Sequence, residues 1–313
     1  MAKVAIVGCG AMGSVYAALM SRAGHEVCCV DTWQDHIAAI HQQGLRVEGA
    51  SGDTRVAVKA SVTPDGIGIC DLIIIATKAF DAEAAADSIE PLIGRDSVVQ
   101  TIQNGIGASE RVANIVGSRQ LAVGVVGGFG ASIVAPGHAH HNGMEMIRFG
   151  AYSGLPRRHL EAAGAIWTSA GFKVAYFDDI EQMVWEKLIM NVAFSGTAFC
   201  TGLTIGEIID TPDAWQTAKQ CAEEAIAVAE RLGITLDVGD PVTHIRTLGS
   251  KIPNARPSML LDHLHQRRSE IDYINGGIAR LASEYRVPAP VNHTIVNIVK
   301  AREAHYPDYS QHP

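Results

Sequence analysis

The sequence predicts an α/β protein in which a doubly wound parallel sheet is followed by an all-helical domain. In the first half of the chain, short apolar runs alternate with segments of helical periodicity, as in a parallel sheet covered on both faces. From residue 180 to residue 300, long helical patterns dominate. The chain of 313 residues is longer than one hydrophobic core usually serves, so we expect two domains, over residues 1–178 and 179–313.

The elements of the first domain follow from apolar runs and from the residues that interrupt them. Strands are predicted at residues 3–8, 25–31, 71–77, 97–105 and 172–177, with a Gly-rich β-like region at 121–150. Helices are predicted at residues 11–23, 33–43, 82–89, 109–116 and 157–170. The first two end at Gly24 and Gly44, because glycine readily adopts the left-handed conformation that closes a helix. Asp178 and Asp179 then mark the domain boundary.

Composition excludes several classes of partner. The net charge is -8 and no Lys/Arg run is present, so we expect no nucleic acid partner. The apolar run at residues 72–76 is too short to span a bilayer, so we expect no membrane insertion. Because a strand pattern begins at Lys3, we expect no signal peptide and a cytoplasmic protein.

Neither the cysteines nor the histidines form a recognisable metal site. The cysteines, none of which lies in a CxxC pair, are Cys9, Cys28, Cys29, Cys70, Cys200 and Cys221. Most lie in strand-like runs, so we interpret them as buried free thiols. His138, His140 and His141 lie together without a carboxylate or cysteine of suitable spacing nearby in the sequence. We interpret their segment as a β-hairpin loop and predict no metal.

The strongest local motif is a glycine-rich turn between a predicted strand and a predicted helix. It reads Gly8-Cys9-Gly10-Ala11-Met12-Gly13. Gly8 allows a tight turn, Gly10 lets the backbone approach a pyrophosphate, and Gly13 lets the helix pack against the strand. The helix N-terminus adds free N–H groups and partial positive charge. The context favours a dinucleotide site in a Rossmann fold over a glycine-rich turn that binds nothing.

Asp31 predicts which nicotinamide cofactor is used. It ends the second predicted strand, 23 residues after Gly8, where an acid that holds the ribose hydroxyls is expected. A carboxylate there repels a 2′-phosphate, and no arginine follows, so NAD(H) is slightly favoured over NADP(H). The alternative is a helix cap or a solvated loop acid.

The segment MVWEKLIMN at residues 183–191 places polar groups on an apolar helix. Lys187 and Asn191 are one turn apart and share a face, which Ser195 extends. Taken alone, this pattern fits a lysine that extends its stem over apolar surface, a satisfied buried amide and an ordinary helix-contact serine. Other motifs are needed to favour a functional interpretation.

Six motifs together resemble the ketopantoate (2-dehydropantoate) 2-reductase family along nearly the whole chain. They are GCGAMG at 8–13, TKAFD at 77–81, QNGIG at 103–107, WEKLIMN at 185–191, SML-D at 258–262 and SEIDYING at 269–276. The resemblance implies a Rossmann domain, a helical domain, and hydride transfer from NAD(P)H to the keto group of a small branched 2-keto acid. Separately from the resemblance, we expect a homodimer, for which the helical domain could supply the dimer face.

The resemblance also implies roles for individual residues. Lys187 is expected to be the catalytic lysine and Glu270 the second catalytic group. We expect substrate contacts from Asn104, Asn191, Ser195 and Ser258, and cofactor contacts from Gly8, Cys9, Gly10, Ala11, Met12, Gly13, Asp31, Lys78 and Asn104. Ser195 and Ile205 stand where well-studied members have asparagine, and Asp31-Thr32 stands where many have a basic residue. These departures leave the identity of substrate and cofactor open.

The expected chemistry explains why a lysine would lie on this helix. Hydride addition to a ketone builds negative charge on oxygen, which an ammonium group stabilises and then protonates. Burial lowers the pKa of such a lysine toward working pH. We therefore expect Lys187 to face a cleft between the domains. Glu270 either accepts a substrate hydroxyl or keeps Lys187 charged; the alternative is a surface acid paired with Arg267.

The relation between Ser258 and Glu270 sets a geometric condition. Twelve residues of straight helix would separate them by ~18 Å, too far to contact one small molecule. We expect Ser258 to hang in a loop at the helix entry, although a bend in the segment would also bring the two together.

Three other functions compete with a ketopantoate reductase. A β-hydroxyacid dehydrogenase shares the KxxxN pattern, but it places a glycine-rich turn shortly before the lysine, and residues 178–184 contain no glycine. A reductase or dehydrogenase of another 2-oxo acid or carbonyl compound fits the departures at Ser195, Ile205 and Asp31. A non-enzymatic NAD(P)-sensing Rossmann protein would not need Lys187.

Overall fold

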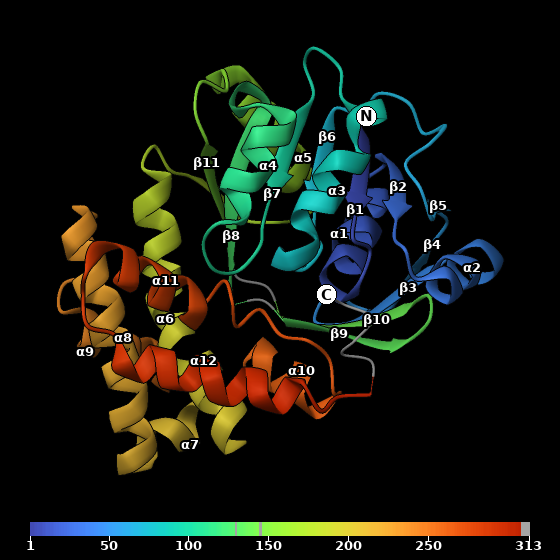
Figure 1. Cartoon of the computed structure of the whole chain (residues 1–313). Helices are drawn as coiled ribbons and strands as arrows, with labels where there is room; N and C mark the ends of the chain where they lie inside the picture. Colours follow the sequence, from blue (N-terminus) through green and yellow to red (C-terminus); the bar gives the residue numbers. More distant parts are fainter. Residues whose placement is uncertain (129, 144–145, 308–313) are drawn as a thin grey trace. The chain divides into compact units, whose positions relative to one another are not determined.

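The structure is a computed structural model that describes residues 1–128, 130–143 and 146–307 (Figure 1). The chain forms two compact units, the first comprising Met1–Gln103 and Ala108–Ile180, the second Asn104–Gly107 and Glu181–Pro313. The main division therefore lies two residues beyond the expected 178/179 boundary. The short excursion of Asn104–Gly107 into the second unit has no counterpart in the sequence pattern.

The first unit is built on an eight-stranded sheet of order β12-β11-β8-β7-β6-β1-β2-β5. Its strands are β1 (Lys3–Val7), β2 (Glu26–Val30), β5 (Lys59–Ser61), β6 (Leu72–Ile75), β7 (Val98–Thr101), β8 (Leu121–Gly127), β11 (Met146–Ala151) and β12 (Val174–Tyr176). All neighbouring strands are parallel except β8 and β11, which are antiparallel. The predicted Rossmann-type α/β fold is confirmed, with its last two strands reversed.

Helices cover both faces of this sheet. They are α1 (Ala11–Arg22), α2 (Gln34–Gln43), α3 (Ala82–Ser88), α4 (Ala108–Val116) and α5 (Arg157–Ser169). Figure 1 shows α3 and α4 in front of the strands and α5 behind them. On the α5 side, Trp167 meets Tyr16 of α1 edge to face at 5.0 Å and donates its indole N–H to Gln100 Oε1 of β7 at 2.8 Å. The all-apolar runs predicted as buried strands are buried for this reason.

A second, four-stranded sheet of order β4-β3-β10-β9 packs on α1. Its strands are β3 (Leu45–Gly49), β4 (Thr54–Val56), β9 (Gly130–Ala135) and β10 (His138–Gly143). The three histidines thus lie within strand β10, not in the hairpin loop as we predicted. The sequence pattern missed this because β10 pairs in parallel with β3, a strand about ninety residues earlier.

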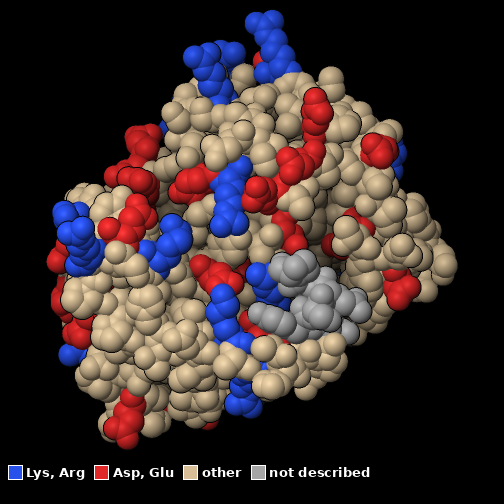
Figure 2. Space-filling model, viewed as in Figure 1, with Lys and Arg blue, Asp and Glu red and all other residues tan. Residues whose placement is uncertain are grey.

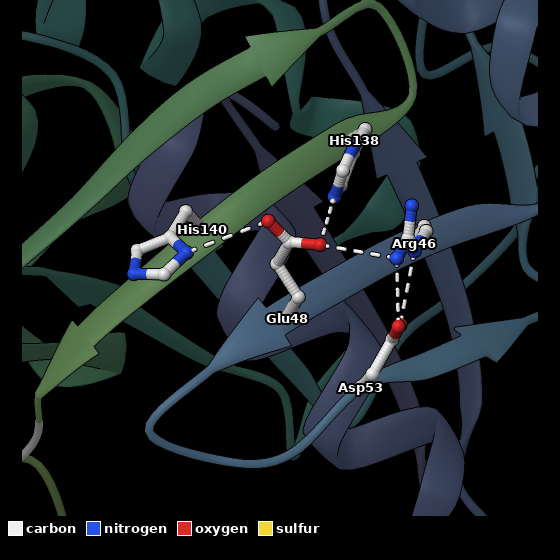
Figure 3. Close-up of polar contacts among 5 residues, drawn as sticks. All are labelled: Arg46, Glu48, Asp53, His138 and His140. Carbon is white, nitrogen blue, oxygen red and sulfur yellow. Dashed lines mark hydrogen bonds and ion pairs between the residues drawn. The ribbon is translucent and has the colours of Figure 1, made fainter.

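Glu48 joins the two central strands of the second sheet (Figure 3). Its carboxylate lies 3.1 Å from His138 Nε2, 3.6 Å from His140 Nδ1 and 3.1 Å from the Arg46 guanidinium. Arg46 also makes a two-pronged contact with Asp53, at 2.9 and 2.7 Å. Within the described ranges, no group of three His, Cys, Asp or Glu side chains could hold a metal ion. These charged contacts therefore link β3 to β10 and to the segment that precedes β4.

The second unit consists of helices, as predicted. They are α6 (Ile180–Thr201), α7 (Ile205–Asp210), α8 (Pro212–Leu232), α9 (Pro241–Ser250), α10 (Ser258–Leu264), α11 (Asn275–Tyr285) and α12 (Pro290–Glu303). Their apolar faces form a separate core. Among the residues that the structure describes, no helix has the length and apolar character needed to cross a membrane.

The cysteine thiols are free, and the drawn surface carries charges of both signs. All six cysteines are free and five are buried, whereas Cys200 is half-buried. On the face drawn in Figure 2, acidic and basic side chains are interspersed, without a broad patch of one sign among the described residues.

Candidate functional site

The glycine-rich turn between β1 and α1 is shaped by two crowded glycines and one open glycine. Gly8 has φ +90°, and a Cβ there would lie 2.5 Å from the Thr77 backbone nitrogen. A Cβ on Gly13 would clash with the Gly8 carbonyl oxygen, so the helix packs directly on the turn. A Cβ on Gly10 would meet no atom within 4 Å. The space over Gly10 is therefore open to a ligand, as a pyrophosphate requires.

The other predicted cofactor residues follow the carboxyl ends of neighbouring strands. Val7 of β1 is in register with Val30 of β2 and Ile75 of β6, so Gly8, Asp31 and Lys78 leave the sheet at one edge. Ligands of open α/β sheets bind at this edge. Asp31 is half-buried, and its Oδ1 accepts a hydrogen bond from the Trp33 N–H at 2.9 Å. Asp31 thus makes a local contact with the backbone of Trp33, which is the N-cap residue of α2, so Asp31 is not the helix cap that the alternative interpretation considered.

Three polar side chains of the second unit form a continuous chain of charge-assisted hydrogen bonds. The Lys187 ammonium of α6 donates to Asn104 Oδ1 at 2.8 Å, and Asn104 Nδ2 donates to Glu270 Oε2 at 3.0 Å. Lys187 and Asn104 are half-buried, whereas Glu270 is only 3% exposed. The amide thus presents its oxygen to the cation and its NH₂ to the anion, the orientation that satisfies both.

Asn104 reaches Glu270 because its segment is docked on the helical unit. The Ile106 N–H donates to the Tyr273 carbonyl at 3.0 Å. Gly105 has φ +83°, and a Cβ there would clash with the same carbonyl oxygen. Ile106 in turn rests on Gly277 of α11, where a Cβ would lie 2.7 Å from its side chain. The Asn-Gly pair in QNGIG is therefore required for close backbone approach, beyond its use in a turn.

Glu270 is held in a tight turn between α10 and α11. Its carbonyl accepts the N–H groups of Tyr273 and Ile274 at 3.0 and 3.1 Å. The preceding residue, Ser269, donates its N–H to Glu303 Oε1 of α12 at 2.9 Å. Glu303 is 1% exposed, and burial raises the pKa of its carboxyl. The sequence reading missed Glu303, because a single acid near the end of a helix gives no signal of its burial.

The remaining predicted substrate residues are not joined to Lys187, Asn104 or Glu270 by a side-chain hydrogen bond among the described residues. Asn191 lies one turn beyond Lys187 on α6 and is half-buried, and Ser195 is 4% exposed. Ser258 is exposed and begins α10, so our expectation of a loop residue is wrong. The side chains of these three residues make no hydrogen bond with any described residue. Lys187, Asn104 and Glu270 are the residues that the structure brings together.

The segment from Ser258 to Glu270 bends, which was our second geometric option. Helix α10 ends at Leu264, and Gln266 has φ 53°, a left-handed conformation that reverses the chain. Arg267, the expected surface partner of Glu270, instead lies 3.5 Å from Asp262. Asp272 takes the surface role, with Lys300 at 2.8 Å. Glu270 is thereby left for the buried contact with Asn104.

We predict that two glycine substitutions in the turn separate ligand binding from folding. Gly10→Ala is expected to leave the melting temperature unchanged but to weaken NADH binding, measured by fluorescence titration, by roughly tenfold or more, because its methyl group fills the open space. Gly13→Ala is expected to lower the melting temperature itself, because the clash is with backbone. Unchanged NADH affinity in Gly10→Ala would contradict the assignment of this turn.

We predict that Glu303 makes stability depend on pH. Because the pKa of Glu303 is raised above 4.5, the folded state binds more protons than the unfolded state between the two pKa values. Its contribution to the free energy of unfolding is therefore fully present below pH 4.5 and is lost as pH rises through the raised pKa. Glu303→Gln should abolish this loss, as measured by urea unfolding from about pH 4 to about pH 8. The exposed substitution Glu284→Gln is the control and should follow wild type; parallel curves for all three proteins would refute the prediction.

Comparison with known proteins places this geometry in a family. The family model described as "Ketopantoate reductase PanE/ApbA" matches residues 4–154, and its C-terminal counterpart matches residues 179–303. A 2-dehydropantoate 2-reductase of Pyrococcus horikoshii is 30% identical over 302 residues, covering 96% of this chain and 98% of the relative.

Solved structures give the same result. A PanE/ApbA family ketopantoate reductase of Ralstonia eutropha superposes with a TM-score of 0.88 at 30% identity, covering 96% of this chain and 98% of that chain. A D-mandelate dehydrogenase solved with NADH and anilino(oxo)acetate superposes with a TM-score of 0.90 at 26% identity, with the same coverage. Because two family models together match most of the residues, the chain belongs to the ketopantoate reductase PanE/ApbA family.

Proposed function

We propose that the protein is an oxidoreductase that transfers hydride from NAD(P)H to the keto group of a small 2-keto acid, with 2-dehydropantoate as the leading substrate and pantoate as the product. The observation that carries the proposal is the Lys187–Asn104–Glu270 chain, at 2.8 and 3.0 Å. The names of the relatives support the substrate.

The residues present fit a nicotinamide cofactor. The open space over Gly10 would admit its pyrophosphate, and the α1 N-terminus offers N–H groups to the phosphates. Asp31 would hold the ribose hydroxyls, and Lys78 would border the cofactor at the same sheet edge. When bound, the reduced cofactor supplies the hydride.

Lys187 supplies the charge and the proton that ketone reduction needs. Its ammonium stabilises the negative charge that develops on the substrate oxygen, then gives that oxygen a proton from Nζ and is left as a neutral amine. Solvent returns the proton. Asn104 Oδ1 holds the ammonium in place, and the Glu270 carboxylate orients the amide that does so. Asn191 and Ser195, on the same helix, and Ser258 are the proposed substrate contacts.

A second candidate is a dehydrogenase of another 2-oxo acid. The fold similarity to a D-mandelate dehydrogenase solved with NADH favours it, as do the departures at Ser195 and Ile205. A non-enzymatic NAD(P) sensor is disfavoured, because it would not need a buried carboxylate aligned through an amide on a lysine.

We also propose NAD(H) as the preferred cofactor, a cytoplasmic location and a homodimer. Asp31 supports the first by repelling a 2′-phosphate. The homodimer is supported only by the presence of exposed large apolar side chains on the helical unit, since Ile252, Leu264 and Ile298 are 44%, 55% and 47% exposed.

We predict that Lys187→Ala strongly lowers turnover but leaves cofactor binding intact. The kcat for the best 2-keto acid should fall by about 10²–10⁴-fold, because the oxyanion loses its charge partner and proton donor. NADH and NADPH oxidation across a panel of 2-keto acids, including 2-dehydropantoate, measures this. Lys251→Ala removes an exposed lysine and should behave as wild type. Full activity of the Lys187→Ala variant would overturn the catalytic role of Lys187, whereas cofactor binding without turnover in the wild type would support the sensor.

We predict that Asp31 sets cofactor preference. Wild type should show the higher kcat/KM with NADH, and Asp31→Ala should shift the NADH/NADPH ratio toward NADPH by roughly tenfold, because like-charge repulsion is removed. Asp35→Ala, in the first turn of α2, is the matched control. A wild-type enzyme that prefers NADPH would overturn the NAD(H) proposal and leave the reductase proposal intact.

A further inference from the structure

Asn275 lies at the crossing of three helices and is fully buried. It is the first residue of α11, and its Nδ2 donates to the Val192 carbonyl of α6 and to Asn292 Oδ1 of α12, both at 2.9 Å. A side-chain amide that contacts a mid-helix carbonyl of α6 fixes both the rotation and the axial position of that helix relative to α11.

Two further side chains hold Asn275 in place. Asn292, also fully buried, donates its Nδ2 to the Cys221 carbonyl and to Glu224 Oε2, at 3.0 and 2.7 Å. The Glu224 carboxylate of α8 accepts the backbone N–H groups of Val291 and Asn292 at 2.8 and 2.9 Å. These N–H groups belong to the first turn of α12 and have no partner within the helix. The polar chain therefore crosses from α8 through α12 to α11 and α6.

Asn275 carries a desolvation cost that an apolar residue at this position would not have. Its Oδ1 is buried with no hydrogen-bond partner among the described residues. A Cβ on Gly196 of α6 would lie 2.9 Å from that oxygen and would clash with Ile295. The helices thus meet closely at a glycine, beside an amide whose oxygen is unsatisfied. In some helical assemblies, a buried polar residue of this kind specifies the register of the packed helices.

Asn275 and its partner Val192 lie close in sequence to the two residues that are proposed to be catalytic. Val192 follows Lys187 by five residues on α6, and Asn275 follows Glu270 by five residues. The Asn275–Val192 bond therefore joins the same two segments that Asn104 joins between Lys187 and Glu270. The Asn104 contacts lie at the proposed catalytic groups, and the Asn275–Val192 hydrogen bond lies about one and a half turns further along α6.

We propose that Asn275 is a positioning residue that fixes the spacing between the Lys187 ammonium and the Glu270 carboxylate, with Asn292 and Glu224 holding its amide in orientation. The inference rests on the proposed reductase function. Asn275 acts through helix register and does not touch the substrate or the reacting atoms.

The test separates catalytic spacing from general stability. Asn275→Leu fills similar volume without either hydrogen bond, and it is expected to lower kcat by about 10–100-fold with KM and NADH affinity within about twofold of wild type, because a displacement near 1 Å misaligns the proton donor. Gly196→Ala, which pushes on the Asn275 oxygen from α6, should show the same split. Val228→Ala removes buried side-chain volume from α8 and is the control: it should lower the melting temperature and leave kcat unchanged.

The outcomes distinguish this inference from the function on which it rests. If the wild-type protein oxidises neither NADH nor NADPH with any of the 2-keto acids tested, the proposed function is overturned. A wild-type enzyme with normal turnover, matched by Asn275→Leu and Gly196→Ala in kcat, overturns the positioning role. An equal loss of kcat in Val228→Ala overturns it too, because general loosening of the helices would then explain the effect. If Asn275→Leu does not fold, Gly196→Ala alone decides between these outcomes.

Discussion

The Asn104 amide, placed between a cation and an anion, is the contact around which the helical unit is organised. A primary amide is neutral, yet it can accept from an ammonium with its oxygen while it donates to a carboxylate with its nitrogen. Lys187 and Glu270 are thereby linked through the Asn104 amide. A direct ion pair would leave the ammonium committed to the carboxylate, whereas an amide oxygen competes less with a developing oxyanion.

This arrangement explains why four residues of the sheet-forming half belong to the helical unit. Asn104 can contact Glu270 only if its backbone lies against the Tyr273 carbonyl, and Gly105 alone allows that approach. In the turn between β1 and α1, close packing likewise requires glycine at Gly8 and Gly13, whereas Gly10 is left open. In both places a glycine is required for close backbone approach, and in the turn between β1 and α1 Gly10 also leaves space for a ligand.

The part of the fold that the sequence predicts is the part encoded locally. Strand β1, the turn and helix α1 follow from an apolar run, three glycines and helical periodicity, all within twenty residues. The second sheet was missed, because β3 and β10 are short and pair across about ninety residues. At the site, residue types pointed to Lys187 and Glu270 only with the help of the family resemblance. Glu303 and the bend after Leu264 depend on tertiary packing, which leaves no periodic trace.

The proposed proton donor differs in exposure from the two positions that depart from the family pattern, and this would separate chemistry from specificity. Lys187 is half-buried, as a group that is proposed to meet a substrate and give up a proton must be. Ser195 and Ile205, which stand where the family resemblance implies asparagine, are 4% and 6% exposed and lie among the helical core. Exchanging a buried amide for a hydroxyl or an isobutyl-sized chain changes volume and hydrogen-bonding capacity without altering charge. The proposed reduction chemistry is therefore compatible with a change in the shape of the accepted keto acid, and a ketopantoate reductase and a D-mandelate dehydrogenase both superpose on this fold.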